Sequence, residues 1–359
     1  MRRRVVLAVL AVVVLAVLVQ LGRILLMGGV FRGIDPHFAG QCRLVPGPVG
    51  AEDLTIHPRT GVAYLSASDR RAELAGAPRP GAIWAYDLED PNAAPVNLTP
   101  DADASFQPHG VSLWVDDAGP DVLFVVNHPP VAGGDPRHTI EIFDVGARRL
   151  VHRATLTHPL LVMPNDLVAV ARNRFYVTNT HRNPPGMLQS LETYLQLAGA
   201  EVLFYGPEGF RVAIDDVVLP NGINVSADGR TLYLASVTPR ELVVYDRDPA
   251  TETLARRATV DLGTGPDNIE VAADGALWIG AHPKLLRLQS HMEDATTLAP
   301  SQVVRVRPAG ADAWDVDEVY LNDGTELAGA SVAAVRGNRL LIGQIFGEGI
   351  LDCEMAAAD

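Results

Sequence analysis

A short apolar strand that opens with polar or small residues recurs six times along the chain. In the clearest copy, residues 220–225, Asn221 and Gly222 lead into alternating apolar positions. The copies start at positions 52, 109, 165, 221, 267 and 330, so that successive copies lie 46 to 63 residues apart. Self-similarity at a period of about 50 residues is typical of a β-propeller or a related array.

Each copy continues in the same way. A turn such as residues 227–229 follows, and then a second apolar strand such as residues 232–234. This pattern predicts the inner hairpin of a propeller blade, and residues 138–146 and 243–245 alternate as outer blade strands do. Inner strands start at the central channel, so we expect their leading residues to converge on one axis.

The leading residues form a polar column. In order they are Glu52, His109, Asn165, Asn221, Asp267 and Ala330, and the residues after them are Asp53, Gly110, Asp166, Gly222, Asn268 and Ser331. Buried carboxylates and amides are costly unless they are paired or bind a cation. Oxygens of Asp, Glu and Asn are the ligands that calcium takes. A β-turn explains any single Asn-Gly pair, but it explains four such pairs in register poorly.

One clear helix interrupts the strand pattern. Apolar residues at positions 187, 188, 191, 194, 195 and 198 fall on one face of a helix over residues 187–198. Packing on the propeller is one interpretation of this face, and contact with a membrane is the other. Residues 69–82 are polar and contain Pro and Gly, which indicates a long loop over one face of the propeller.

The N-terminus combines positive charge with an apolar run. Arginines at positions 2–4 precede the uninterrupted run at residues 5–19. Residues 1–30 are therefore a signal peptide or a signal anchor, and the anchor is favoured because no small-x-small cleavage site follows directly. The charge distribution places the following domain outside the cytoplasm, in a periplasmic, lumenal or extracellular space. We expect a linker at 31–41 and the propeller domain at 42–359.

Composition narrows the function. The net charge is −14 over 359 residues, which argues against nucleic-acid binding and suits cations, although an acidic soluble surface is the alternative. No Gly-x-Ser-x-Gly, CxxC, HExxH or P-loop pattern occurs. Cys42 and Cys353 are the two cysteines, and in an oxidising compartment we expect a disulfide between them rather than two free thiols.

Eight fragments carry a resemblance to a known family. They are residues 51–54, 108–110, 126–129, 164–166, 176–179, 220–224, 267–269 and 280–283. Together, in this order, they resemble the serum paraoxonase/arylesterase family from about Cys42 to Cys353. The resemblance implies a six-bladed propeller with two Ca²⁺ ions in its central tunnel. It also implies a retained N-terminal hydrophobic segment and a disulfide joining the chain ends.

The resemblance also implies roles for individual residues. It assigns the catalytic calcium to Glu52, Asn165, Asn221, Asp267 and Asn268, and the structural calcium to Asp53, Asp166 and the main-chain carbonyl of Val111. It further implies a dyad in which His109 takes a proton from water and His128 hydrogen-bonds the other ring nitrogen of His109. A ligand carboxylate, Glu52 or Asp267, is the alternative base. His282, His181 and Leu219 are candidate pocket walls.

The sequence thus predicts a membrane-anchored, calcium-dependent hydrolase of lactones and aryl esters, with phosphotriesterase activity as some members of the family have. Its substrate would be a small ester or lactone, and the oligomeric state is not indicated. A gluconolactonase-like or strictosidine-synthase-like enzyme is the alternative within the fold, and a non-catalytic, calcium-stabilised binding module is the alternative without chemistry. The loop at 68–82 and Leu219 depart from the family, which leaves substrate preference open.

Overall fold

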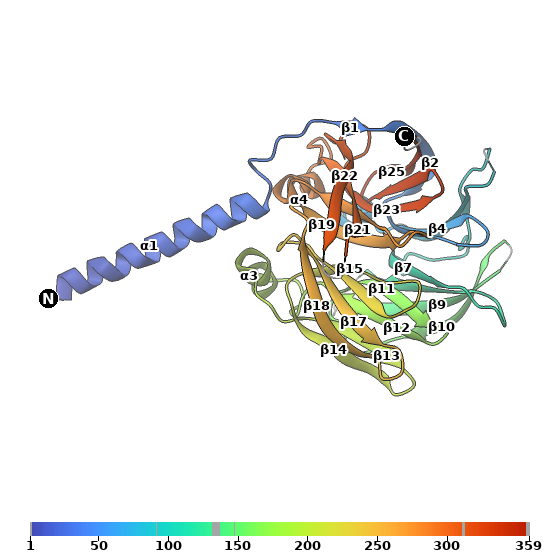
Figure 1. The fold of residues 1–359 in the computed structure, drawn as a ribbon, viewed down its shortest axis with the longest axis horizontal. Coiled ribbons are helices and arrows are strands. Elements are labelled where there is room, and N and C mark those ends of the chain that lie inside the picture. Colours follow the sequence, from blue (N-terminus) through green and yellow to red (C-terminus); the bar gives the residue numbers. More distant parts are fainter. Residues whose placement is uncertain (1, 91, 131–136, 147, 311–312, 357–359) are drawn as a thin grey trace.

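The protein is a six-bladed β-propeller with a long N-terminal helix, as the sequence predicts (Figure 1). The computed structural model describes residues 2–90, 92–130, 137–146, 148–310 and 313–356. Each of the six antiparallel sheets is one blade, and its four main strands follow one another from the channel outward. The blades are successive in sequence, with the exception of the last, which both ends of the chain build.

In the first three blades the four strands lie in sequence order from the channel outward. The first blade contains β3 (Ala51–Ile56), β4 (Val62–Ala67), β5 (Ala82–Asp87) and β6 (Val96–Asn97). The second contains β7 (Pro108–Trp114), β8 (Val122–Asn127), β9 (Thr139–Val145) and β10 (Leu150–Leu156). The third contains β11 (Pro164–Ala171), β12 (Arg174–Asn179), β13 (Ala200–Gly206) and β14 (Gly209–Val217).

The remaining blades repeat this arrangement. The fourth contains β15 (Pro220–Val225), β16 (Thr231–Ser236), β17 (Glu241–Asp248) and β18 (Thr253–Asp261). The fifth contains β19 (Gly265–Val271), β20 (Leu277–His282), β21 (Ser301–Pro308) and β22 (Trp314–Asn322), with β1 (His37–Phe38) added at its outer edge. The sixth contains β23 (Ala330–Arg336), β24 (Arg339–Gln344), β25 (Glu348–Met355) and β2 (Gly40–Val49).

The sixth blade closes the ring. Its outermost strand, β2, comes from the start of the domain and pairs antiparallel with β25 from the end of the chain. Cys42 and Cys353 lie opposite each other in this pairing and form a disulfide that spans 311 residues. The predicted disulfide is therefore confirmed.

The inner strands approach each other so closely that glycine is required beside the channel. A Cβ atom on Gly110 would lie 2.5 Å from the carbonyl oxygen of Asn165, and one on Gly222 would lie 2.4 Å from that of Asp267. Such separations leave no room for a side chain. The Gly that follows His109 or Asn221 thus lets adjacent blades meet backbone to backbone and brings the leading residues together.

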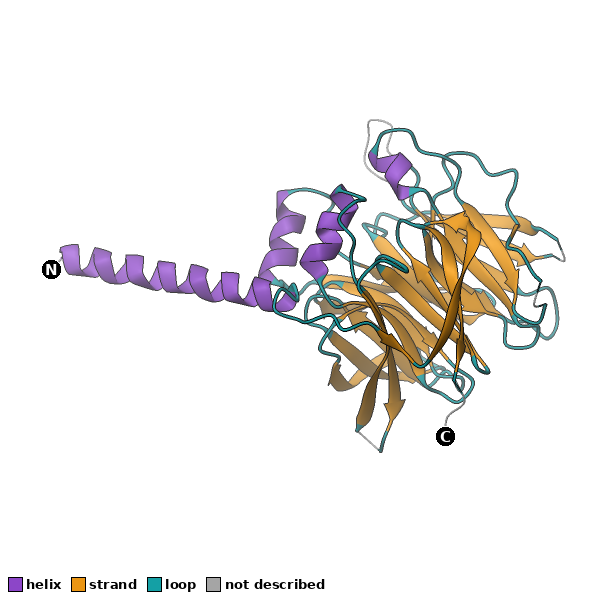
Figure 2. Cartoon of the chain, turned by 90° about the horizontal axis from the view of Figure 1, so that it is seen from above, coloured by secondary structure: helices purple, strands orange, loops and turns teal. Residues whose placement is uncertain are grey.

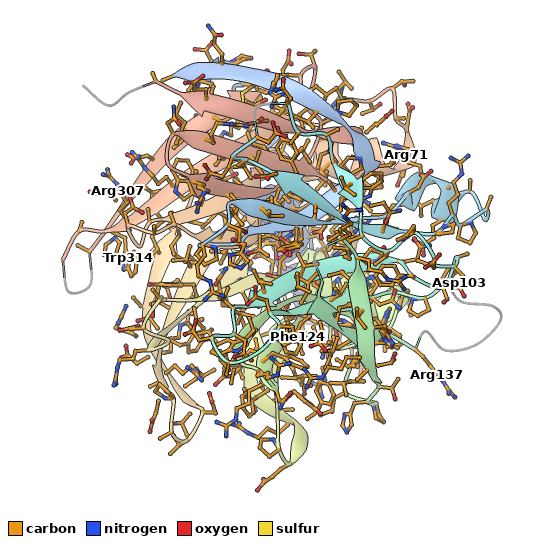
Figure 3. The ribbon with its side chains drawn as sticks, turned by 90° about the vertical axis from the view of Figure 1, so that its right-hand side faces the viewer. Arg71, Asp103, Phe124, Arg137, Arg307 and Trp314 are labelled. Carbon is orange, nitrogen blue, oxygen red and sulfur yellow. A yellow bond between two sulfur atoms is a disulfide. The ribbon has the colours of Figure 1, made fainter. Side chains whose placement is uncertain are left out.

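Apolar side chains fill the space between neighbouring blades. Phe124 of the second blade packs against Phe175 of the third with 5.4 Å between ring centroids, and both rings are fully buried. Figure 3 shows Phe124 in the interior of the green strands. Because successive side chains point to opposite faces of a strand, a strand such as β8, in which all six residues are buried, packs against neighbours on both of its faces.

Helices gather at one side of the propeller (Figures 1 and 2). Helix α3 (Met187–Leu195) confirms the predicted helix but ends earlier, where Gln196 adopts a left-handed φ of 52°. Helices α2 (Arg70–Leu74) and α4 (Leu285–Glu293) were not predicted; α2 lies in the segment interpreted as a loop. Helix α1 (Arg2–Met27) projects away from the propeller and has no buried residue.

Candidate metal centre and catalytic site

The polar column predicted from the sequence lies at one end of the central channel. Glu52, His109, Asn165, Asn221 and Asp267 all stand at the second or third residue of an inner strand. We call this the upper end of the channel, and the end where the same strands finish the lower end. One leading residue comes from each of the first five blades.

Five buried oxygens at the upper end have no hydrogen-bond partner among the described residues. They are Glu52 Oε2, Asn165 Oδ1, Asn221 Oδ1, Asp267 Oδ1 and Asn268 Oδ1. These oxygens belong to the five residues predicted to hold the catalytic calcium. A buried oxygen without a partner costs folding free energy, and a hard cation would satisfy all five together. The residues present therefore fit a calcium ion.

The other oxygens of this set are held in place by neighbours. Asn268 Nδ2 donates to Glu52 Oε1 at 2.9 Å, and His282 Nε2 lies 2.7 Å from Asp267 Oδ2. Burial and the nearby Asp267 raise the pKa of Glu52 to about 7. No trio of His, Cys, Asp and Glu with metal-binding geometry occurs in the described parts of the chain, and a set of two carboxylates and three amides suits calcium better than zinc.

Asp53 and Asp166 lie one position further down the channel and have different surroundings. Asp53 Oδ2 accepts a hydrogen bond from the amide of Val111 at 2.7 Å, and Asp166 Oδ2 accepts one from Ile223 at 2.8 Å. Burial and the charge of Asp166 raise the pKa of Asp53 well above its usual value. A cation between these carboxylates would relieve that repulsion. The predicted role of the Val111 carbonyl stays a prediction.

The lower end of the channel opens into a cavity of about 940 Å³ that reaches Asp53 and Asp166. Glu270 lines this cavity. Its carboxylate accepts hydrogen bonds from Thr55 Oγ1 at 3.1 Å and Asn224 Nδ2 at 3.3 Å, and burial raises its pKa to about 8. Sequence reasoning missed Glu270, although its place two residues after Asn268 on an inner strand indicates that the two side chains share a face.

His109 meets a different partner from the one expected. Its Nδ1 lies 2.8 Å from Nη2 of Arg70, and its Nε2 lies 3.7 Å from Glu52 Oε1. Burial and the neighbouring Arg70 keep the pKa of His109 well below its usual value. Because a guanidinium only donates hydrogen bonds, Nδ1 of His109 is the acceptor, and the neutral ring carries its proton on Nε2.

His128 stacks on His109 rather than hydrogen-bonding to it. The ring centroids are 4.7 Å apart with an interplanar angle of 24°. Its Nε2 donates to the carbonyl oxygen of Pro164 at 2.6 Å. The structure thus brings the two predicted histidines together, but the hydrogen bond expected between their ring nitrogens is taken by Arg70 and Pro164.

The predicted wall residues differ in their distance from the centre. His282 contacts Asp267 directly. His181 lies 3.3 Å from Glu192 of helix α3, and no contact joins it to the calcium ligands among the described residues. Leu219 is buried and has a left-handed φ of 41° just before Pro220. Of these three, His282 is the residue for which the described structure shows a hydrogen-bond contact with a predicted calcium ligand.

Sequence reasoning also missed Arg70. It belongs to the non-repeating segment between β4 and β5, and its contact with His109 crosses 39 residues. An arginine in a polar segment is usually solvated, so no local pattern marked it. The one available signal was that this segment departs from the family.

Sequence comparisons give close relatives over nearly the full chain. Serum paraoxonase/arylesterase 2 of Rattus norvegicus is 36% identical over 324 residues, which cover 88% of this chain and 89% of the relative. Serum paraoxonase/arylesterase 1 of Homo sapiens is 35% identical over 334 residues, covering 90% and 91%.

Solved structures share the fold at low sequence identity. A luciferin-regenerating enzyme matches with a TM-score of 0.56 and 10% identity, over 89% of this chain and 98% of that chain. A gluconolactonase of Xanthomonas campestris matches with a TM-score of 0.54 and 18% identity, over 90% and 95%. The family model of the arylesterases matches residues 34–355. This chain, with its six-bladed propeller and its channel of acidic and amide residues, belongs to the arylesterase family.

Proposed function

We propose that this protein is a calcium-dependent hydrolase that opens lactones and cleaves aryl esters. The observation that carries the proposal is the set of five partnerless oxygens at the upper end of the channel. Membership of the arylesterase family, whose relatives are named paraoxonase/arylesterase, supports the reaction class. We further propose a second calcium at Asp53 and Asp166, where it would hold the inner strands together.

A bound calcium would polarise the ester carbonyl and stabilise the oxyanion. Of the two candidate bases, the geometry favours the carboxylate of Asp267. Its Oδ1 is one of the five oxygens proposed to bind calcium, and its Oδ2, which lies 2.7 Å from His282 Nε2, keeps a second lone pair that can accept a proton from the attacking water. The new bond joins the water oxygen to the carbonyl carbon. The ester C–O bond then breaks, and the proton passes to the leaving oxygen.

In this proposal His109 serves as a hydrogen-bond donor instead of the base. Arg70 occupies Nδ1, so the Nε2–H of the neutral ring points toward the Glu52 side of the site. That N–H can donate to the developing oxyanion or to the leaving oxygen. His128 supports the ring by stacking, and its own proton is held by Pro164.

A matched pair of variants separates the two roles of His109. A glutamine side chain keeps an N–H donor but cannot act as a base near neutral pH. If His109 donates, His109→Gln keeps at least about 10-fold more kcat than His109→Ala. Equal losses in both variants would assign the base to His109 instead.

The reaction class is tested on the full chain in detergent. We expect hydrolysis of a panel of aliphatic lactones and phenyl acetate with calcium, loss of that activity on chelation, and recovery on adding calcium back. Turnover that survives complete chelation would contradict calcium dependence. No turnover on any member, with calcium still raising the melting temperature, would favour the non-catalytic binding module.

We also propose that α1 is an uncleaved anchor which holds the domain outside the cytoplasm. This helix is long and apolar enough to cross a membrane. A cleaved signal sequence can have the same length and composition. The disulfide supports an oxidising compartment. Retention of the protein in membranes after alkaline extraction, with residue 5 still present in the mature chain, is the expected result. A mature chain that starts near residue 31 would identify a cleaved signal peptide.

A further inference from the structure

Arg70 is a largely buried cation beside His109, and among the described residues the one carboxylate within 4.0 Å of its guanidinium is that of Glu52. Only 14% of its side chain is exposed. Its Nη1 donates to the carbonyl oxygens of Gly50 at 3.1 Å and Ile345 at 3.3 Å, and its Nη2 contacts His109 Nδ1. All three acceptors are neutral. A guanidinium has five N–H donors, so two donors, on Nε and Nη2, have no hydrogen-bond partner among the described residues.

Helix α2 holds Arg70 in this position. Asp69 caps the helix by accepting from the amide of Ala72 at 3.0 Å. The next residue, Arg71, donates to the carbonyl oxygen of His291 in α4 at 3.0 Å and lies 4.6 Å from the ring of Phe346. Figure 3 shows Arg71 beside the short helix at the rim of the propeller. The guanidinium of Arg70 is therefore fixed before substrate arrives, which lowers the entropic cost of binding.

The carboxylate nearest to Arg70 is proposed to bind calcium. The nearest carboxylate oxygen is Glu52 Oε2, 4.0 Å from Arg70 Nη2, and it is one of the five oxygens assigned to calcium. One calcium ion would neutralise the two negative charges of Glu52 and Asp267. Glu73 also influences Arg70 through its charge, but no hydrogen bond or ion pair joins them in the described structure. With Glu52 and Asp267 bound to calcium, Arg70 would have no carboxylate of its own within hydrogen-bond distance among the described residues.

We propose that Arg70 makes this site select lactones and esters that carry a carboxylate close to the reacting ester. Two N–H groups of a guanidinium match the two oxygens of a carboxylate, and such charge-assisted bonds are strong in a buried setting. An anionic substituent would offset the buried charge, whereas a neutral substrate would leave it unpaired. This inference rests on the proposed function of the same site and names its substrate class.

Binding is measured first, with lactams that resist hydrolysis. Pyroglutamate is a lactam with a carboxylate on the ring, and pyrrolidone is the same ring without it. Isothermal titration calorimetry on the calcium-loaded full chain should give at least about 10-fold tighter binding of pyroglutamate. Arg70→Gln should remove this preference. Arg79→Gln is the matched control, because Arg79 lies in the same segment with 76% of its side chain exposed and should keep it.

Turnover is measured next, with a pair of lactones that differ in the same way. The γ-lactone of hydroxyglutarate carries a carboxylate where γ-valerolactone carries a methyl group. The ratio of their kcat/KM values should fall at least about 10-fold in Arg70→Gln. Using the ratio cancels any effect that the substitution has through His109, since that effect acts on both substrates.

The outcomes separate this inference from the function on which it rests. Equal binding of the two lactams by the wild-type protein would overturn the role of Arg70, and that comparison needs no variant to fold. An unchanged preference in Arg70→Gln would overturn it as well. An Arg70-dependent preference for pyroglutamate without turnover of any lactone would keep the carboxylate subsite and reject the hydrolase.

Discussion

The two ends of the central channel contain similar residues but use them differently. At the upper end, five oxygens from the first, third, fourth and fifth blades have no hydrogen-bond partner in the part of the chain that the structure describes. Below them, each oxygen of Asp53 and Asp166 accepts a backbone amide hydrogen, and the bonds to Val111 and Ile223 cross to the next blade. Identical carboxylates therefore serve as open ligands in one place and as links between strands in the other.

This difference gives each end its own expected phenotype. An oxygen that binds only a cation should matter for activity and calcium affinity, and little for the fold. An oxygen that also ties two strands together should matter for stability even with calcium in excess. The predictions below separate these two expectations.

The largest effect is expected at the upper end. Asp267→Ala removes one partnerless oxygen and the group proposed as base, and should lower kcat/KM at least about 1,000-fold. Asn221→Ala removes a ligand alone and should lose less activity but as much calcium affinity. Both should keep the far-ultraviolet circular dichroism of the wild type. Normal turnover in either variant would remove that residue from the metal centre.

Loss of the disulfide that closes the propeller should lower the stability of the whole domain. Cys42→Ser removes the covalent link between β2 and β25. In the chain-entropy model, a disulfide that closes such a loop stabilises the folded state by about 5–6 kcal/mol as an upper figure. We expect a large fall in the urea midpoint under calcium. Cys353→Ser is the matched variant and should behave alike. An unchanged midpoint, together with two titratable thiols in the wild type, would show that the bond does not form.

At Asp53 and Asp166, below the five partnerless oxygens, we expect a substitution to lower mainly the stability of the fold. Asp166→Ala leaves the amides of Leu167 and Ile223 buried without their acceptor. It should cost roughly 3 kcal/mol of unfolding free energy with calcium in excess. Asn221→Ala, measured in parallel, should cost clearly less. Equal losses would mean that the two ends do not divide their roles in this way.

The smallest effect is a dependence of calcium stabilisation on pH. Without calcium, burial raises the pKa of Glu52 from 4.5 to about 7. The folded chain then binds more protons than the unfolded chain, so apo stability falls as pH rises from about 4.5 to about 7. Calcium requires the ionised form and removes this loss. The difference in melting temperature between loaded and chelated protein should grow from about pH 5 to about pH 8.

Glu270 provides a check on the origin of that pH dependence. Its pKa is raised to about 8 at the lower end, so Glu270→Gln should reduce the part of the change nearest pH 8 and leave the part near pH 7. If the melting-temperature difference is flat across this range, the carboxylates of the channel are already ionised in the apo protein.

The polar column at the upper end of the channel was predictable from the sequence because the fold repeats. Each leading residue occupies the same place in its blade, so a column in the sequence becomes a ring in space, and Glu52 and Asp267 meet without any pattern that joins them directly. Arg70 and helix α4 could not be found in this way. Arg70 reaches the site from a segment that has no counterpart in other blades. The N-cap residue of α4, Lys284, makes no capping hydrogen bond with its side chain, so no capping signal marks the start of this helix. The tautomer of His109 depends on its contact with Arg70, so the sequence could not predict the tautomer either.

The pairing of β2 with β25 also sets the order in which the protein can mature. Asn268 and Glu52 belong to the same proposed ion site, yet 216 residues separate them. A chain emerging from the ribosome or a translocon therefore lacks a complete calcium site until the fifth blade has been made. It cannot close its ring until Cys353, 311 residues after Cys42, has appeared. Until then, the first blade lacks the neighbour that covers its apolar face, and such exposed apolar surface makes a folding intermediate prone to aggregation.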